Sequence, residues 1–193
     1  MAQMKTPGVY IIEKNAFPNS VVEVATAIPA FIGHTQFARD GNKDLTGIPF
    51  RISSMAEFHS FFGFAPTLRF GIRPEDSESE DTTNDINVLF PDGSCQLTLP
   101  KTFYALYYNM LLFYANGGGP CYIVSVGDYE HDFKSIDFTN ALLALKKEQE
   151  PTLVVVPEAV YMEEGDCYKV QTAALMHCGN DMKNRFAILY VFN

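Results

Sequence analysis

Histidines and cysteines are the side chains of this sequence that most often hold metals or act as nucleophiles in proteins. The chain has four of each: His34, His59, His131, His177, Cys95, Cys121, Cys167 and Cys178. No two cysteines show the C-x-x-C spacing of zinc and thioredoxin-type sites, and no two histidines show H-x-x-H or H-E-x-x-H spacing. His177 and Cys178 are adjacent, so on a helix their side chains point in different directions and form no nucleophile–base pair. We therefore expect no metal centre and no thiol catalysis, and we expect Cys121, Cys167 and Cys178 to be buried thiols of a reducing compartment.

The remaining chemistry-bearing motifs are also absent or weak. The run Gly117–Gly119 lacks the G-K-[ST] ending of a P-loop and precedes a strand instead of a helix, so we expect it to end a helix and turn the chain. No G-x-S-x-G motif offers a serine nucleophile. The acidic pairs Glu163-Glu164 and Glu148/Glu150 have the character of solvated loop residues. The sequence thus predicts no catalytic residue, no bound cofactor and no enzyme activity.

Two histidines have more specific expected positions. His34 follows an apolar segment and should stand at the carboxyl end of a strand, where ligand sites of α/β proteins often lie. A structural role at the strand exit is the favoured interpretation, and a small-ligand enzyme site formed with the Gly117–Gly119 turn is the alternative. His177 is expected in the last turn of a helix, where a positive charge interacts favourably with the helix dipole. Before the last strand we expect a charged surface cluster: Asp181, Lys183 and Arg185.

Hydrophobic periodicity predicts the elements that carry these residues. Residues 21–35 contain a predicted strand pair, of which the second member, AIPAFIG, is buried. From residue 100 onward the pattern alternates between helices at 102–115, 137–148 and 166–177 and strands at 121–126, 152–158 and 185–191. We expect the first of these helices, apolar on nearly every face, to be buried, and Asp137 and Asp166 to cap the other two. Continuous apolar strands between helices predict an α/β fold with a mostly parallel sheet flanked by helices.

Residues 36–99 are predicted to be an inserted α+β segment. Ser54 and Glu57 form a capping box for a helix that closes at Gly63. A hairpin follows, with strands at 86–90 and 95–99. Residues 75–85 carry six acidic residues and no basic one, which supplies most of the net charge of −9 and indicates a solvated loop. An acidic chain argues against a nucleic-acid partner. The apolar stretch 103–115 is too short to span a bilayer.

Residues 1–20 are predicted to be an extended arm. Pro7-Gly8 bends the chain before a short strand that has no local partner: Val9, Tyr10, Ile11, Ile12 and Glu13. Because side chains alternate along a strand, Val9 and Ile11 would face one side of a sheet and Tyr10 and Ile12 the other. The hinge that follows the strand is expected at Asn15, Pro18 and Asn19. An unpaired strand of this kind predicts pairing with another chain.

The order of these segments resembles that of the contractile tail sheath family, which includes phage tail sheaths, R-type pyocins and extracellular contractile injection systems. The similar stretches are TPGVYIIEK, AIPAFIGHT, PFRISSMAEFHSFFG (49–63), YALYYNMLLFYANGGGPCYIVSVG (104–127), TLVVVPEA (152–159) and MHCGNDMKNRFAILYV (176–191). They occur in family order and span nearly the whole chain. The resemblance implies a subtilisin-like core, made by 21–35 and 100–193, that is incomplete in this sequence. Family members continue past the strand matching 185–191 into a part that carries a second arm and the main tube contacts.

The resemblance also implies a function and partners. Sheath subunits polymerise around an inner tube, are linked by strand-exchanging arms, and contract to drive the tube through a target envelope. The implied partners are neighbouring sheath subunits, the inner tube protein, and baseplate and terminator proteins, with no nucleic acid and no membrane insertion. Such particles assemble in the bacterial cytoplasm and become part of a virion tail or a released contractile particle. Another tail component, a baseplate or adaptor protein with a strand-donating arm, is the second structural alternative.

Overall fold

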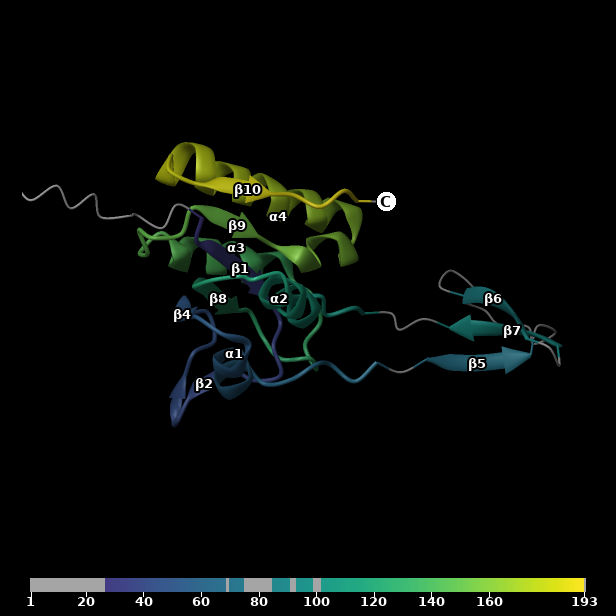
Figure 1. The fold of residues 1–193 in the computed structure, drawn as a ribbon. Coiled ribbons are helices and arrows are strands. Elements are labelled where there is room, and N and C mark those ends of the chain that lie inside the picture. Colours follow the sequence, from purple (N-terminus) through teal and green to yellow (C-terminus); the bar gives the residue numbers. More distant parts are fainter. Residues whose placement is uncertain (1–26, 69, 75–84, 91–92, 99–101, 193) are drawn as a thin grey trace, which may run out of the picture.

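A five-stranded, mostly parallel sheet forms the centre of the protein, with strand order β10-β9-β1-β8-β4 (Figure 1). The computed structural model describes residues 27–68, 70–74, 85–90, 93–98 and 102–192. The strands of the main sheet are β1 (Pro29–Gly33), β4 (Phe50–Ile52), β8 (Cys121–Ser125), β9 (Leu153–Val155) and β10 (Phe186–Ile188). Strands β10, β9, β1 and β8 run parallel, and β4 pairs antiparallel to β8 at one edge. The predicted α/β class with a mostly parallel sheet flanked by helices is confirmed.

Helices lie on both faces of this sheet. The helices are α1 (Met55–Phe62), α2 (Leu106–Ala115), α3 (Ser135–Leu145) and α4 (Glu164–Met176), with a 3₁₀ turn, η1, at Pro157–Tyr161 and a π-helical turn, η2, at His177–Met182. One core cluster joins α3 and α4 to the sheet, and a second joins α1 and α2 to the opposite face. The central strands β1 and β8 are therefore buried between two layers of helices.

Strict alternation along each strand divides the side chains between these two core clusters. On β1, Ala30 and Ile32 point to the α3–α4 side, whereas Phe31 points to the α1–α2 side. The register pairs Phe31 with Ile123 on one neighbour and with Val155 on the other, so the three residues form one row across the second face. Because side chains alternate along a strand, the apolar residues of β1, β8 and β9 are divided between two separate core clusters.

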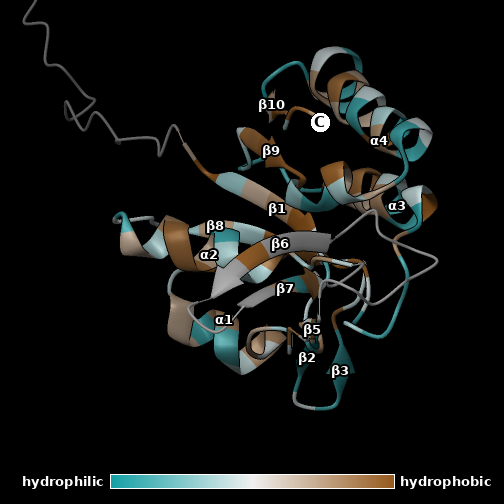
Figure 2. Ribbon diagram, turned by 90° about the vertical axis from the view of Figure 1, so that its right-hand side faces the viewer, coloured by the Kyte–Doolittle hydropathy of each residue, from teal (hydrophilic) through white to brown (hydrophobic). Residues whose placement is uncertain are grey.

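The segment predicted as an insertion divides into two parts. Strand β4 belongs to the main sheet, and α1 buries Phe58 and Phe62 in the second core cluster. Strands β2 (Arg39–Asp40) and β3 (Lys43–Asp44) form a short polar hairpin, teal in Figure 2, in contrast to the brown of β9. Strands β5 (Gly71–Pro74), β6 (Asp85–Phe90) and β7 (Gly93–Thr98) form a separate antiparallel sheet that lies apart from the main sheet in Figure 1. The predicted β6–β7 hairpin is confirmed.

Helix starts were predicted well at α1 and wrongly at α3 and α4. The Ser54 hydroxyl accepts the Glu57 backbone N–H at 3.2 Å, as in a capping box, while the Glu57 carboxylate accepts the backbone N–H of Ser53 at 2.6 Å. Helix α3 begins at Ser135 and α4 at Glu164, so Asp137 and Asp166 lie inside the first turn instead of at the cap. Both carboxylates still interact favourably with the positive end of the helix dipole, which explains why their positions suggested caps.

Helix α2 is not buried in the way its composition predicted. Only Leu106 and Met110 are fully buried, whereas Leu111 is 47% and Leu112 65% exposed. The reason is the sheet beneath it, because α2 packs over β1 and β8 and no described element covers β9 and β10 on the same side. After α2 the chain turns as expected at the glycine run, where Gly117 has φ of 80° and Gly118 N–H donates to the carbonyl of Phe113 at 2.9 Å.

Candidate functional site: a free strand edge beside an open apolar groove

The predicted arm, Val9–Glu13, and the predicted hinge residues Asn15, Pro18 and Asn19 lie outside the residues that the structure describes. A donated strand needs a receiving sheet edge, and the described strands include the two edges of the main sheet. Two further positions could bind a ligand or a partner: the carboxyl end of the parallel strands, where α/β proteins bind ligands, and the part of the sheet beside α2 that no described element covers.

The carboxyl ends of β1 and β9 form the point where the strand order reverses, because β1 connects to β8 on one side and β9 connects to β10 on the other. His34 leaves β1 here, as predicted, and Glu158 leaves β9 in η1. The Glu158 carboxylate accepts the His34 backbone N–H at 2.8 Å and the Leu106 backbone N–H, at the start of α2, at 3.2 Å. The His34 Nδ1 atom also lies 2.8 Å from it. An internal carboxylate therefore occupies the helix N-terminus where an α/β protein would hold an anionic ligand.

The surroundings of this pair leave it closed to solvent. His34 and Glu158 are exposed by only 1% and 0%, and three rings, those of Tyr104, Phe133 and Phe138, surround the imidazole. A Cβ added at Gly33 would lie 2.9 Å from Cβ of Leu106, so β1 and α2 approach too closely for a side chain. The arrangement ties β1, β9 and α2 together, and it supports the structural interpretation of His34.

Among the described strands, β10 forms one edge of the main sheet, and none of them pairs with its outer side. The backbone N–H of Phe186 donates to the carbonyl of Thr152 at 2.9 Å, so the backbone groups of Phe186 point toward β9. By alternation the N–H and C=O of Ala187 point away from the sheet, to the side where no described strand pairs. The side chains of Phe186 and Ile188, both on the α2 side of the sheet, are 76% and 45% exposed. Strand β10 is thus an uncharged edge with apolar residues beside it.

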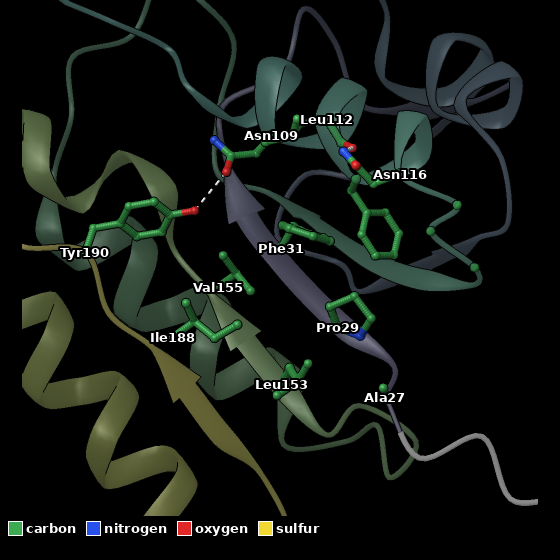
Figure 3. A pocket seen from close by; sticks show the side chains of 14 residues that line it. Ala27, Pro29, Phe31, Asn109, Leu112, Asn116, Leu153, Val155, Ile188 and Tyr190 are labelled. Atoms are coloured by element: carbon green, nitrogen blue, oxygen red, sulfur yellow. Dashed lines mark hydrogen bonds between the residues drawn. The ribbon is translucent and has the colours of Figure 1, made fainter.

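An apolar groove of about 580 Å³ runs alongside this edge, between α2 and β10 (Figure 3). Its floor consists of alternate residues of three strands: Pro29, Phe31, Leu153, Val155 and Ile188. Leu112 and Asn116 of α2 form one wall, Ala27 lies at one end, and the Gly117–Gly119 turn also lines the groove. None of the residues that line the groove carries a charge, although the chain has a net charge of −9.

A hydrogen bond closes the other end of the groove. The Tyr190 hydroxyl donates to Oδ1 of Asn109 at 2.8 Å, which links the segment after β10 to α2 across the groove (Figure 3). Burial raises the pKa of Tyr190, so the hydroxyl keeps the proton that it donates. The Tyr190 carbonyl accepts a hydrogen bond from Nε2 of Gln171 on α4 at 2.7 Å. The segment after β10 is therefore held from both faces of the sheet, and no described strand is needed on the outer side of β10 to hold it.

The opposite edge, β4, differs from β10 in its chemistry. Its central residue is Arg51, whose Nε atom lies 3.1 Å from the Glu150 carboxylate on an exposed part of the surface. A charged residue on an edge strand discourages pairing with another chain. On the β4 side the same sheet face is also covered by α1. Of the two edges of the main sheet, β10 is the one suited to receive a strand.

Sequence reasoning identified one partner of the buried pair and missed the rest of the site. Glu158 could have been found, because it follows a buried strand in the same way that His34 does. For Ile188 and Tyr190 no sequence signal was available, since the pattern of RFAILYV is the same in a central and an edge strand.

Comparisons with protein-family models and with curated proteins give no match to this chain. Within the described ranges, no group of three or more His, Cys, Asp and Glu residues is placed to hold a metal ion. Of the helices in those ranges, none is both long and apolar enough to cross a membrane.

Proposed function

We propose that this chain is a structural, non-enzymatic subunit of a contractile sheath, in which the N-terminal arm of one copy adds a strand to β10 of the next. The observation that carries the proposal is the uncharged free edge of β10 beside the open apolar groove. An edge of this kind is normally hidden in a monomeric protein, because it is a template for pairing with another chain. The resemblance of the sequence to tail sheath proteins supplies the assembly in which such an edge has a use.

The proposed contact is β-augmentation. The Ala187 N–H and C=O would pair with backbone groups of the arm strand Val9–Glu13, which would lie about 4.8 Å from β10. One set of alternating arm side chains, either Val9 and Ile11 or Tyr10 and Ile12, would then lie on the side of Ile188 and the groove. The donor and acceptor surfaces are different, so the contact is head-to-tail and propagates into a ring or filament instead of closing a dimer.

The wider assembly rests on the resemblance. The proposed partners are neighbouring subunits, an inner tube protein, and baseplate and terminator proteins of a phage tail or a related contractile particle. The edge and the groove also suit a baseplate or adaptor component, which would use the same strand addition in fewer copies. The enzyme alternative has less support, because the Glu158 carboxylate fills the position at which a ligand of an α/β enzyme would bind.

The test separates the donor from the acceptor. We expect Ile11→Asp, which alters the donor, and Ala187→Pro, which removes the outward N–H of the acceptor, each to abolish polymers seen by negative-stain electron microscopy. Ala187→Val is the matched control, because it retains that N–H. A synthetic peptide of residues 1–20 should bind the Ile11→Asp protein and should not bind the Ala187→Pro protein.

Two results would count against the proposal. Polymers of normal appearance from both variants would exclude strand addition at β10. Equal binding of the peptide to both variants would move the acceptor to another surface. Circular dichroism of each variant must match the parent chain, so that loss of assembly is not loss of the fold. The number of copies per native particle then distinguishes a sheath subunit from a baseplate component.

A further inference from the structure

A buried histidine and a buried arginine lie in contact next to β10. His177 starts the π-helical turn η2, and Arg185 immediately precedes β10; their exposed fractions are 2% and 4%. The Arg185 Nη1 atom lies 3.0 Å from Nε2 of His177. Both residues were expected in other roles: the dipole position would favour a charged His177, and the charged cluster of Arg185 was predicted on the surface. The structure corrects both expectations.

The geometry requires His177 to be neutral. A guanidinium has only donors, so Nε2 of His177 must be the acceptor and any proton of the neutral ring must be on Nδ1. Among the described residues Nδ1 of His177 has no hydrogen-bond partner, and neither does Nε of Arg185. A second proton on the ring would place two cations in contact away from water, which is strongly unfavourable.

Arg185 connects β10 to the end of α3. Its Nη1 atom donates to the carbonyl of Leu145 at 3.1 Å, and its Nη2 atom donates to the carbonyl of Glu148. These carbonyls belong to the last turn of α3 and to the segment after it, so the guanidinium closes the helix C-terminus. The residue that follows Arg185 makes the first hydrogen bond of β10 with β9. The position of β10 therefore depends on where this guanidinium is held.

Charges on the neighbouring elements do not compensate for a second cation. Asp181 of η2 favours a charged His177, but Asp181 is already paired with Lys146 at 2.7 Å, and Lys146 disfavours the charge. Burial and the Arg185 charge are the larger effects, and together they lower the pKa of His177 to about 4. Glu148 and Cys178 interact with the Arg185 charge, and Arg185 hydrogen-bonds to the Glu148 backbone and not to its carboxylate.

We propose that His177 and Arg185 form an acid-sensitive latch for β10, in which protonation of His177 separates the two residues and releases the start of β10 from the sheet. The latch is a property of this chain alone and does not depend on what binds to the edge. If β10 is also the acceptor of a neighbouring arm, acidification would weaken that contact.

The pH window follows from the two states of His177. When β10 is in place the ring stays neutral down to about pH 4, whereas a released His177 would take up its proton near pH 6.5. Between these values the open state binds one more proton than the closed state, so opening becomes easier as the pH falls, by up to tenfold per pH unit. Above about pH 6.5 the latch is closed and opening does not depend on this residue.

Hydrogen exchange of the parent chain tests the latch. Between pH 6.5 and pH 4.5, after correction for intrinsic exchange, protection of the β10 amides that point toward β9, such as that of Phe186, should fall about tenfold per pH unit, while protection of β8 stays constant. His177→Gln can still accept from Arg185 but does not titrate, so its β10 protection should be independent of pH. His131→Gln, at an exposed histidine, is the matched control and should behave as the parent chain.

Three outcomes would overturn the proposal: constant β10 protection in the parent chain, the same loss in His177→Gln, or loss of the slope in His131→Gln. An imidazole titration of the parent chain by nuclear magnetic resonance keeps the test decisive if His177→Gln does not fold. The His177 signal should titrate below pH 5 and together with β10 opening. Titration near pH 6.5 with an unchanged β10 would contradict the latch.

Discussion

The two faces of the main sheet are built from the same strands but are covered to different extents. On the α3–α4 face, the side chains of Phe138 and Val170 are fully buried against the strands. On the opposite face, α1 and α2 cover β4, β8 and β1, whereas Ile188 beside the groove is 45% exposed. In the described part of the chain, one face is a complete core, and the other is a partial core next to an edge that no described strand pairs with.

The difference shows which apolar side chains stabilise the fold and which remain exposed for binding a partner. Burial of a Val, Leu, Ile or Phe side chain stabilises a protein by about 1.5–3 kcal/mol relative to exposure. The side chains of the α3–α4 face are already buried, so their burial already stabilises the fold. Phe186 and Ile188 are still partly exposed, so a partner that covers them would gain the rest of the free energy of their burial. We therefore expect mutations on the two faces to affect different properties.

The largest effect is expected on the covered face. Phe138→Ala should reduce the free energy of unfolding by about 3–5 kcal/mol, because it removes a buried ring and leaves a cavity between α3 and the sheet. Urea denaturation measures the change. Ile136→Ala on the same helix, at a position 59% exposed, is the control and should stay within about 0.5 kcal/mol. Similar losses in both variants would mean that the α3–α4 face is not the main core.

The second effect concerns the pair that ties both faces together. Glu158→Gln should destabilise the fold by about 2–3 kcal/mol, since an amide replaces the carboxylate that accepts from both His34 and Leu106. The exposed Glu164→Gln is the matched control. A ligand that restores the stability of the Glu158→Gln protein would indicate that the closed position at the strand ends is a binding site after all.

A smaller change in stability, with a large change in assembly, is expected at the free edge. Ile188→Ser should alter the free energy of unfolding by less than about 1 kcal/mol, because the side chain is only partly buried. The same substitution should weaken binding of the residue 1–20 peptide at least tenfold in a titration. Val154→Ser, on β9 but in the covered core, should show the reverse pattern. If Ile188→Ser unfolds the protein, the edge belongs to the core.

The smallest effect on stability is expected at the wall of the groove. Leu112→Ser replaces a side chain that is 65% exposed on α2, so the free energy of unfolding should change by no more than about 0.5 kcal/mol. Leu111→Ser, at a neighbouring exposed position of α2 that does not line the groove, is the control for assembly. Electron microscopy should show shorter or fewer polymers for Leu112→Ser only. Equal assembly of the two variants would show that the groove wall does not take part in the proposed contact.

Several helices, strands and turns were predictable from the sequence, because the interactions that form them lie within a few residues. The helix at Met55–Phe62 followed from Ser54, Glu57 and Gly63, whose interactions span one turn. The strand at Cys121–Ser125 followed from a continuous apolar run, and the turn before it from the Gly117–Gly119 run. The predicted strand 152–158 was too long, because Pro157 starts a 3₁₀ turn that the apolar run conceals.

The candidate site was only partly predictable. His34 was correctly placed at the end of a strand, but its partner Glu158 lies 124 positions away in the chain. The burial of Arg185 was missed, because a charged residue before a strand is exposed in most proteins. In this protein its guanidinium is buried and hydrogen-bonds to the carbonyl of Leu145, the last residue of α3. Hydrogen bonds to distant backbone groups leave no trace in the pattern of apolar and polar residues.

The sequence by itself determined the four helices and the continuous apolar strands, though neither their exact bounds nor the short strands β2, β3 and β5, and it determined the α/β class through the alternation of helices and strands. Tertiary structure alone decided that RFAILYV lies at an edge, that α2 leaves part of one face open, and that His177 contacts a cation. The physical reason is the range of the interactions involved. Capping, turns and periodicity act within a few residues, whereas strand order, coverage of a sheet face and the charge beside a buried ring depend on segments that meet only in the folded chain.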